Sequence, residues 1–407
     1  LARAHERLSA PVDAASLGAF RALLGVVLLV SIVRALEKDV VAQGFVAPQY
    51  FFPYYGLAWL PAPGAAASAI YGVLALLGLG LTLGVYTRLA AALFALGFSY
   101  LHFVDVTHYL NHYYLVTLLT GLLALVPIGA SAPRWGLWLF RFQVGVVYFF
   151  GGVAKLRHDW LFAAEPLRTW LAANTDLPLL GPLFALRETA FVMSWLGAAY
   201  DSSIVFLLLW RRTRPFAYLA VLAFHLLTAR LFQIGLFPWM MMVASLLFLS
   251  PSWPRRFASF SAFEPRAYAL PRWLALYVAW QLLVPLRHWL YPGNVLWSEQ
   301  GYRWSWNVML MEKTGSAEFR VVHDGQQRTV FPRKYLTQAQ DKMMATQPDM
   351  ILQFAHFLAQ RHDAAVYADV WVSLNGRQAA RLIDPGVDLA RETDTLANKP
   401  WILPAPD

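Results

Sequence analysis

Residues 136–155 read GLWLFRFQVGVVYFFGGVAK, a run of twenty residues whose only charged side chains are Arg141 and the terminal Lys155. A bilayer core about 30 Å thick is crossed by roughly 20 apolar residues of helix. The run is therefore predicted to be a membrane-spanning helix that ends at Lys155. Its last turn contains Gly151-Gly152, and small residues of this kind let membrane helices pack closely.

Eight further apolar runs lie on either side of this one. Hydrophobic residues make up 58% of the 407-residue chain and charged residues only 14%, against roughly 25% charged in a typical globular domain. We predict an all-α multi-span membrane domain of about nine helices over residues 1–290. The other predicted spans are 17–36, 66–86, 89–107, 111–129, 188–210, 215–231, 234–250 and 271–290.

The net charge of +9 falls largely in short loops between the apolar runs, a pattern of membrane topology that argues against nucleic-acid binding. Basic clusters such as Trp210-Arg211-Arg212 and Pro254-Arg255-Arg256 favour a cytoplasmic location for their loops. Nine crossings then place the chain from Tyr291 onward outside the cytoplasm. The absence of cysteine excludes disulfides, thiolate metal ligands and cysteine nucleophiles.

From Tyr291 the sequence becomes polar and alternating, which indicates a small extracytoplasmic α+β domain over residues 291–407. Asp324-Gly325 and Asn375-Gly376 each lie between two alternating runs, so they predict two β-hairpins. Two helices are predicted between the hairpins. Their signals are a capping box at Thr337 and Gln340, a break at Pro348, and Asp349 as a cap of the second helix.

Polar side chains in the predicted spans gather at one depth, in the outer third of the membrane and facing the C-terminal domain. Such residues are costly in lipid and suggest a functional site. Each also has a simpler explanation, because a terminal lysine can snorkel to the headgroups and a membrane histidine can bond a neighbouring carbonyl. The polar side chains at this depth come from four predicted spans and are His102, Asp105, His108, Asn111, His112, Lys155 and His225.

Metal chemistry is considered because His108 and His112 are four residues apart and His102 is near them in sequence. Histidine-rich iron enzymes need boxes with adjacent histidine pairs, whereas none of the 10 histidines here has a histidine neighbour. The chain also lacks His-Glu-x-x-His, Gly-x-Ser-x-Gly and phosphate-binding glycine motifs. We therefore predict no metal. The sequence also offers no candidate residue for a hydrolase or a nucleotide-binding site.

Several strings together resemble the vitamin K-dependent gamma-carboxylases and the wider family that shares their HTTM membrane domain. The resemblance covers most of the chain. In the membrane half the strings are LNHYYL at 110–115, YFFGGVAKL at 148–156 with Asp159-Trp160, Phe224-His225, LFQIGLF at 231–237 and SPSWPR at 250–255. In the last third they are YRWSWNVM at 302–309, DVWVSLNGR at 369–377 and DPGVD at 384–388.

The resemblance implies a reaction. Members of this family take vitamin K hydroquinone, oxygen and carbon dioxide, convert the hydroquinone to its epoxide, and remove a γ-proton from glutamate in a protein or peptide, which carbon dioxide then captures. By this resemblance Lys155 is the base that deprotonates the hydroquinone, of the menaquinol or phylloquinol type. Because a base needs an unprotonated amine, we expect an apolar site that disfavours the ammonium.

The other site residues are implied in the same way. Asn111 and His112 match polar residues near the quinone oxygens, with orienting and catalytic roles. The implied cofactor-binding residues are His225, Tyr148, Trp306 and Met309. Residues 306–309 resemble a stretch that contacts glutamate and quinone, which would make the C-terminal domain a lid that keeps water from the strong base.

The sequence departs from the animal members at several positions. They have two consecutive lysines where this chain has Ala154-Lys155, and Thr228 and Arg230 replace expected amides. The sequence ends at Asp407, without the long C-terminal extension of the animal enzymes. We expect a short bacterial member in the inner membrane with its site on the periplasmic side, or on the lumenal side of the endoplasmic reticulum in a eukaryote.

Two other functions remain open from the sequence. One is a membrane enzyme that oxidises a quinol without carboxylation, which would incorporate no labelled carbon dioxide into a glutamyl peptide. The other is a transporter or lipid-binding membrane protein, for which Lys155→Ala would preserve function. Transporters often contain inverted repeats and paired broken helices, and neither pattern is apparent here.

Overall fold

The apolar runs in the first two-thirds of the chain fold into helices, as the sequence predicts. The protein is described by a computed structural model that covers residues 2–406. Within these residues, four helices are long and apolar enough to cross a membrane. They are α2 (Ala15–Glu37), α3 (Ala66–Leu83), α6 (Arg134–Lys155) and α10 (Arg187–Leu209).

The other five predicted spans form helices that are shorter or less apolar, so helix length and composition do not establish nine crossings. The region predicted as 89–107 ends as α-helix at Phe103, because Asp105 accepts a hydrogen bond from the Thr107 backbone and caps a 3-10 turn, η2 (Val106–His108). The five helices are α4 (Thr87–Phe103), α5 (Asn111–Leu125), α11 (Arg214–Leu231), α12 (Phe237–Ser245) continued by η3 (Leu246–Phe248), and α13 (Trp273–Leu283) continued by η5 (Val284–Leu290).

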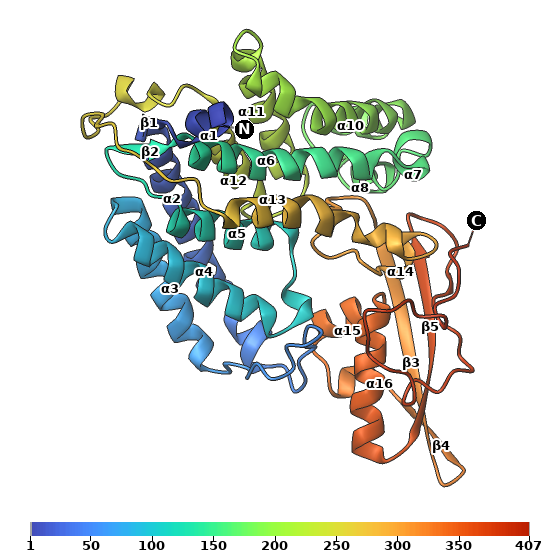
Figure 1. The fold of residues 1–407 in the computed structure, drawn as a ribbon. Helices are drawn as coiled ribbons and strands as arrows, with labels where there is room; N and C mark the ends of the chain where they lie inside the picture. Colours follow the sequence, from blue (N-terminus) through green and yellow to red (C-terminus); the bar gives the residue numbers. More distant parts are fainter. Residues whose placement is uncertain (1, 407) are drawn as a thin grey trace.

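Helix α6 lies at the centre of the helical part. It packs against α10 on one side and α13 on another, and the three run side by side in Figure 1. Helix α12 contacts both α6 and α2. Helix α3 packs against α2 and α4, and α4 also packs against α5. Large apolar side chains cover the outer surface, as expected for helices in contact with lipid. Examples are Leu76, Leu83, Leu96, Phe206, Phe216, Leu219 and Leu276.

Short elements connect the long helices. Strands β1 (Pro11–Asp13) and β2 (Ser131–Pro133) pair antiparallel, which ties the beginning of the chain to the start of α6. The remaining short elements of the helical part are α1 (Ala2–Ser9), the π-helix η1 (Ala42–Val46), α7 (His158–Phe162), α8 (Leu167–Ala172), α9 (Gly181–Phe184) and η4 (Trp253–Arg256).

The C-terminal part contains an antiparallel sheet in the order β4-β3-β5-β6. Both predicted hairpins are confirmed, because β3 (Lys313–His323) pairs with β4 (Gln326–Val330) and β5 (Ala365–Leu374) pairs with β6 (Ala380–Arg381). The other elements are α14 (Val295–Ser298), η6 (Pro332–Lys334), α15 (Gln338–Met344) and α16 (Pro348–His362). Helix α16 packs against β3 and β5.

The two predicted helices of this part are confirmed, but one of their predicted caps is wrong. Thr337 and Gln340 form the full capping box at the start of α15. Helix α16 instead begins after Gln347, with Pro348 in its first turn and no side-chain cap. Asp349 forms an ion pair with Arg303, so its carboxylate serves a tertiary contact.

The hydrophobic core continues from the C-terminal part into the ends of the membrane helices. Phe319 and Phe354 belong to the same buried cluster as Ala154 of α6, Trp160 of α7 and Ala198 of α10. A bidentate ion pair reinforces this junction, since the Asp159 carboxylate accepts hydrogen bonds of 2.7 and 2.8 Å from Arg377. The C-terminal part is therefore held directly over the end of α6.

Candidate active site

The glycine pair near the end of α6 brings that helix against α10. A Cβ atom on Gly152 would lie 2.7 Å from the Ser202 Oγ and 2.8 Å from its backbone nitrogen, distances that no side chain tolerates. This close approach places the Lys155 Nζ 2.7 Å from Asp201 Oδ2. The Lys155 Nζ also donates to the Gly151 carbonyl at 3.3 Å and lies 5.2 Å from the Trp160 ring centre.

Lys155 and Asp201 line a largely apolar cavity, here called the inner cavity. Its walls come from α6, α7, α8, α10, α11, α12 and the segment 308–309. The cavity has a volume of about 90 Å³, below the 300–1,000 Å³ typical of small-molecule sites. A ring-sized ligand therefore requires side chains such as Met241 and Met309 to move, and unbranched methionine adapts readily. Other lining residues include Tyr148, Trp160, His225, Phe232, Phe237 and Val308.

A hydrogen-bonded pair of side chains forms part of the wall of the inner cavity. The Tyr148 hydroxyl and His225 Nε2 are 2.9 Å apart, and both side chains are buried. The other ring nitrogen, His225 Nδ1, is buried without a hydrogen-bond partner among the described residues. Because unpaired buried polar atoms are uncommon, this nitrogen is a candidate contact for a polar group of a ligand.

The segment 304–309 covers the site from the C-terminal side. Trp304, Trp306 and Met309 all have positive φ angles, of 62°, 56° and 55°. Non-glycine residues adopt this conformation only when their surroundings enforce it, and such strain gathers at functional sites. Here the Asn111 side chain donates to the Asn307 carbonyl at 3.1 Å, and the Trp306 ring stacks on the Tyr114 ring at 5.1 Å. Contacts from α5 thus hold the segment in place.

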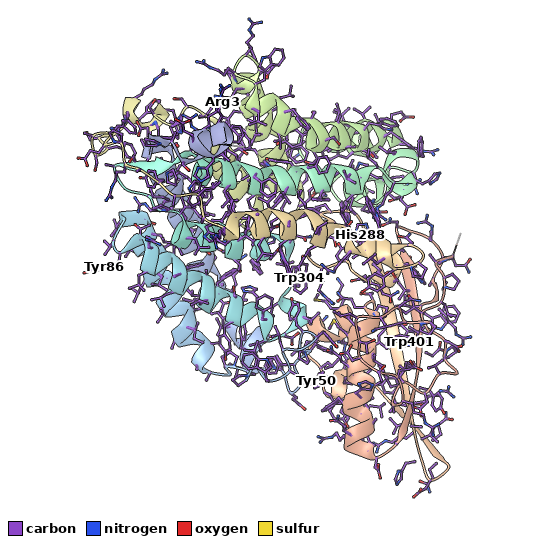
Figure 2. The ribbon with its side chains drawn as sticks, in the orientation of Figure 1. Arg3, Tyr50, Tyr86, His288, Trp304 and Trp401 are labelled. Atoms are coloured by element: carbon purple, nitrogen blue, oxygen red, sulfur yellow. The ribbon has the colours of Figure 1, made fainter. Side chains whose placement is uncertain are left out.

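A second cavity is lined by the loop at 53–57, by α13 and η5, and by residues of the C-terminal part that include 298–304. This outer cavity has a volume of about 350 Å³. Trp304 is part of its wall, and Figure 2 shows this residue at the junction of the two parts. The Arg287 guanidinium stacks over the Trp304 ring at 5.0 Å. The segment 304–309 therefore contributes to both cavities, with Trp304 in the outer, more polar one and Val308 and Met309 in the inner, apolar one.

Comparison with known families assigns both parts of the chain. Residues 9–253 match the HTTM domain, and residues 267–407 match the lumenal domain of vitamin K-dependent gamma-carboxylase. The chain belongs to the vitamin K-dependent gamma-carboxylase family. No solved structure matches the chain. Membership in this gamma-carboxylase family implies a membrane protein that depends on vitamin K and acts on glutamate-containing protein.

Four of the residues assigned from the gamma-carboxylase resemblance meet at the inner cavity. Lys155, Tyr148, His225 and Met309 all line it. This arrangement draws on α6, α11 and the 304–309 segment, which lie far apart in sequence.

Asn111, His112 and Trp306 are predicted site residues that do not line the inner cavity. Asn111 holds the covering segment through the Asn307 carbonyl, and Trp306 is fully buried within that segment. The Phe237 ring centre lies 6.1 Å from that of His112 and 6.0 Å from that of His225. Phe237 therefore packs near both histidines.

The expectation of an apolar site around Lys155 leaves out one group, because Asp201 supplies a carboxylate at hydrogen-bond distance within an otherwise largely apolar lining. The sequence contained a signal for this residue. Asp201 is the only acidic or basic side chain in residues 189–210, and an ionisable group inside a predicted span is a candidate functional residue by default. Trp160 and Phe237 gave no comparable signal, since aromatic residues are common throughout the chain.

The lining of the inner cavity suits the head group of a quinol once the methionine side chains move aside. Its walls are aromatic and thioether side chains, which suit a flat apolar ring. Buried polar atoms without partners lie at or beside it, namely His225 Nδ1, Trp306 Nε1 and the Asn307 amide. His102 and His108, considered above as metal ligands, instead direct their Nδ1 atoms to the carbonyls of Phe98 and Leu101.

Proposed function

We propose that this protein is a vitamin K-dependent gamma-glutamyl carboxylase, in which Lys155 deprotonates vitamin K hydroquinone at the inner cavity. Oxidation of the quinol to its epoxide by oxygen supplies the strong base that removes the γ-proton of glutamate before carbon dioxide adds. The single observation that carries this proposal is the position of Lys155. Its amine faces an apolar cavity in the membrane part of a chain whose family depends on vitamin K.

The residues around Lys155 support distinct roles in this reaction. The Tyr148–His225 pair and the free His225 Nδ1 are suited to hydrogen-bond and orient a quinol oxygen. Met309 and Val308 close the cavity from the C-terminal side and exclude water, which would otherwise consume a strong base. Asn111 positions this covering segment through the Asn307 carbonyl. His112 does not line the cavity, and we propose that it orients the quinol indirectly through the neighbouring Phe237 ring.

The two cavities support a reaction with two organic substrates. We assign the quinol to the inner cavity and the glutamate-containing protein or peptide to the outer cavity. Arg287 in the outer cavity stacks on Trp304 and donates a hydrogen bond to the Arg303 carbonyl, and it forms no ion pair among the described residues. Its remaining N–H groups can therefore bind the carboxylate of a substrate. The covering segment 304–309 then lies between the two substrates.

We also propose the membrane arrangement. Residues 1–290 form the domain embedded in the bilayer with nine crossings, and residues 291–407 form the extracytoplasmic domain. In a bacterium this domain faces the periplasm. Because the chain has no cysteine, single cysteines at the exposed positions Ser259 and Gln327 can test the arrangement with an impermeant maleimide. Labelling of Ser259→Cys in intact cells would contradict it.

The reaction is tested with purified protein in detergent, vitamin K hydroquinone, oxygen, labelled carbon dioxide and a short glutamate peptide. We expect both epoxide and labelled peptide from the wild type, and neither from Lys155→Ala. Ser202→Ala, the neighbour of Asp201 on α10, serves as the control. Epoxide without labelled peptide would indicate quinol oxidation without carboxylation. Neither product, or equal products from Lys155→Ala, would refute the assignment.

A further inference from the structure

One buried acid has no role in the proposed reaction. Asp201 lies in α10, is 9% exposed, and contacts the Lys155 Nζ at 2.7 Å. The other contacts of that amine are weaker, since the Gly151 carbonyl lies at 3.3 Å and the Trp160 ring centre at 5.2 Å. The Asp201 carboxylate is therefore the main electrostatic partner of the proposed base.

Few other groups act on this pair. Tyr148 and His225 face the inner cavity from α6 and α11, and Tyr200 lies beside Asp201 with its hydroxyl 3.4 Å from that of Tyr148. The contributions of α7, α8, α12 and residues 308–309 to the wall are apolar or aromatic. Among the described residues that line the cavity, Lys155, Asp201 and His225 are the only acidic or basic side chains.

A lysine that deprotonates a quinol needs considerable base strength. A phenolic O–H ionises at about pH 10 in water, whereas lysines buried without a counter-charge can lose their proton at roughly pH 5 to 6. An isolated buried amine would have an available lone pair but too little affinity for a phenolic proton. A carboxylate at hydrogen-bond distance stabilises the ammonium and so makes the amine a stronger base.

We infer that Asp201 sets the base strength of Lys155, so that the pair rather than the lysine alone takes the proton of the quinol. This inference rests on the proposed function. In the step, the quinol O–H bond breaks, its electron pair stays on the quinol oxygen, and an N–H bond forms at the neutral Lys155 amine. The resulting ammonium is held by the Asp201 carboxylate. Asp201 acts through Lys155 and is thus a positioning residue.

Asp201→Asn tests this role because it keeps the shape of the side chain and removes the charge. We expect two opposite changes in quinol consumption. The rise of the rate with pH moves to lower pH, since an unpaired amine is freed more easily, while the maximal rate falls at least about tenfold, since the base is weaker. Asp201→Glu should restore the pH range of the wild type, and Ser202→Ala should change neither quantity. An Asp201→Asn variant with the maximal rate and pH profile of the wild type would overturn the inference.

A second measurement does not depend on turnover. Cyanate carbamoylates only unprotonated amines, and it is small enough for the inner cavity, so mass spectrometry of Lys155 after treatment at several pH values reports its protonation without any quinol. We expect carbamoylation of Lys155 to begin at lower pH in Asp201→Asn than in the wild type. The same pH dependence in both proteins would refute a role for Asp201. If the wild type consumes no quinol, the proposed function fails, and this labelling still decides whether Asp201 controls Lys155.

Discussion

The chain contains two buried lysine–carboxylate pairs that look alike in isolation. Lys155 and Asp201 join α6 to α10 with a nitrogen–oxygen distance of 2.7 Å, and their side chains are 6% and 11% exposed. Lys313 and Glu299 join β3 to the end of α14 at 2.9 Å, with exposures of 3% and 6%. The difference between these two pairs lies in what surrounds them.

Lys313 lines neither cavity, although its partner Glu299 lines the outer one, whereas Lys155 faces the inner cavity. The Lys313 ammonium has a second close acceptor, the Trp297 carbonyl at 2.7 Å. Burial lowers the pKa of Lys313, and the Glu299 carboxylate opposes that shift. Lys155 has a weaker second acceptor, at 3.3 Å, and an open side lined by aromatic residues. A buried ion pair alone therefore does not make a base, and the open side of Lys155 is what gives it access to a substrate.

The largest expected effect is that of Lys155→Arg, and the same exchange at Lys313 is its control. Arginine keeps the charge and can bind the carboxylate, but it does not release its proton at accessible pH. Lys155→Arg should lower quinol oxidation by about 10²–10⁴-fold, the usual contribution of a general base. Lys313→Arg should retain activity in the folded protein. The rate of epoxide formation measures both variants, and a Lys155→Arg variant within tenfold of the wild type would disprove the base assignment.

Removing the carboxylate of the Lys313–Glu299 pair should affect stability. Glu299→Gln leaves the Lys313 ammonium buried beside a neutral amide, and breaking a buried pair in this way costs about 3 kcal/mol or more. We expect the C-terminal domain to unfold at lower urea concentration, measured by protease resistance of the detergent-solubilised protein. Lys313→Met with Glu299→Gln should recover much of the loss, because both charges are then absent. Unchanged urea resistance in Glu299→Gln would show that the pair is not structurally important.

The sequence predicted a helix that ends at Lys155 and the type of most elements, since apolar runs and turn residues act locally. The Asp324-Gly325 and Asn375-Gly376 turns and the Thr337–Gln340 capping box were all placed correctly. The contacts between distant segments were not predicted. Asp201 was overlooked as the partner of Lys155, and Asp349 was assigned to a helix cap although Arg303 takes its carboxylate. Such pairings depend on how helices approach one another, which local periodicity does not encode.

The approach of α6 to α10 can be changed without altering either member of the Lys155–Asp201 pair. Gly152→Ala would place a methyl group against the Ser202 backbone, so the helices must separate. We expect a longer Lys155–Asp201 distance and about tenfold slower quinol oxidation, since misplacement of a catalytic group by an ångström can cost 10²-fold. Gly145→Ala is the matched control, because its Cβ would meet only the Val205 side chain at 3.4 Å. Equal rates for the two variants would contradict a requirement for close packing at Gly152.

The smallest expected effect concerns an ion pair that is neither enclosed nor next to the inner cavity. Hydrogen bonds from Arg377 are the main cause of the lowered pKa of Asp159, with burial opposing them. Because this pKa is lower in the folded protein than the ordinary value of about 3.9, the pair stabilises the fold above that pH, and the contribution is lost as pH falls through the folded value.

Arg377→Met should therefore destabilise the docked C-terminal domain by about 1–2 kcal/mol at neutral pH, a value reduced by the partial exposure of the pair. The difference from the wild type should shrink below about pH 4, where Asp159 becomes protonated in the unfolded chain. Urea unfolding of both proteins between pH 3 and 7 measures this. A difference that stays constant over the whole range would show that Arg377 acts by packing, and that the charge of Asp159 contributes little to docking.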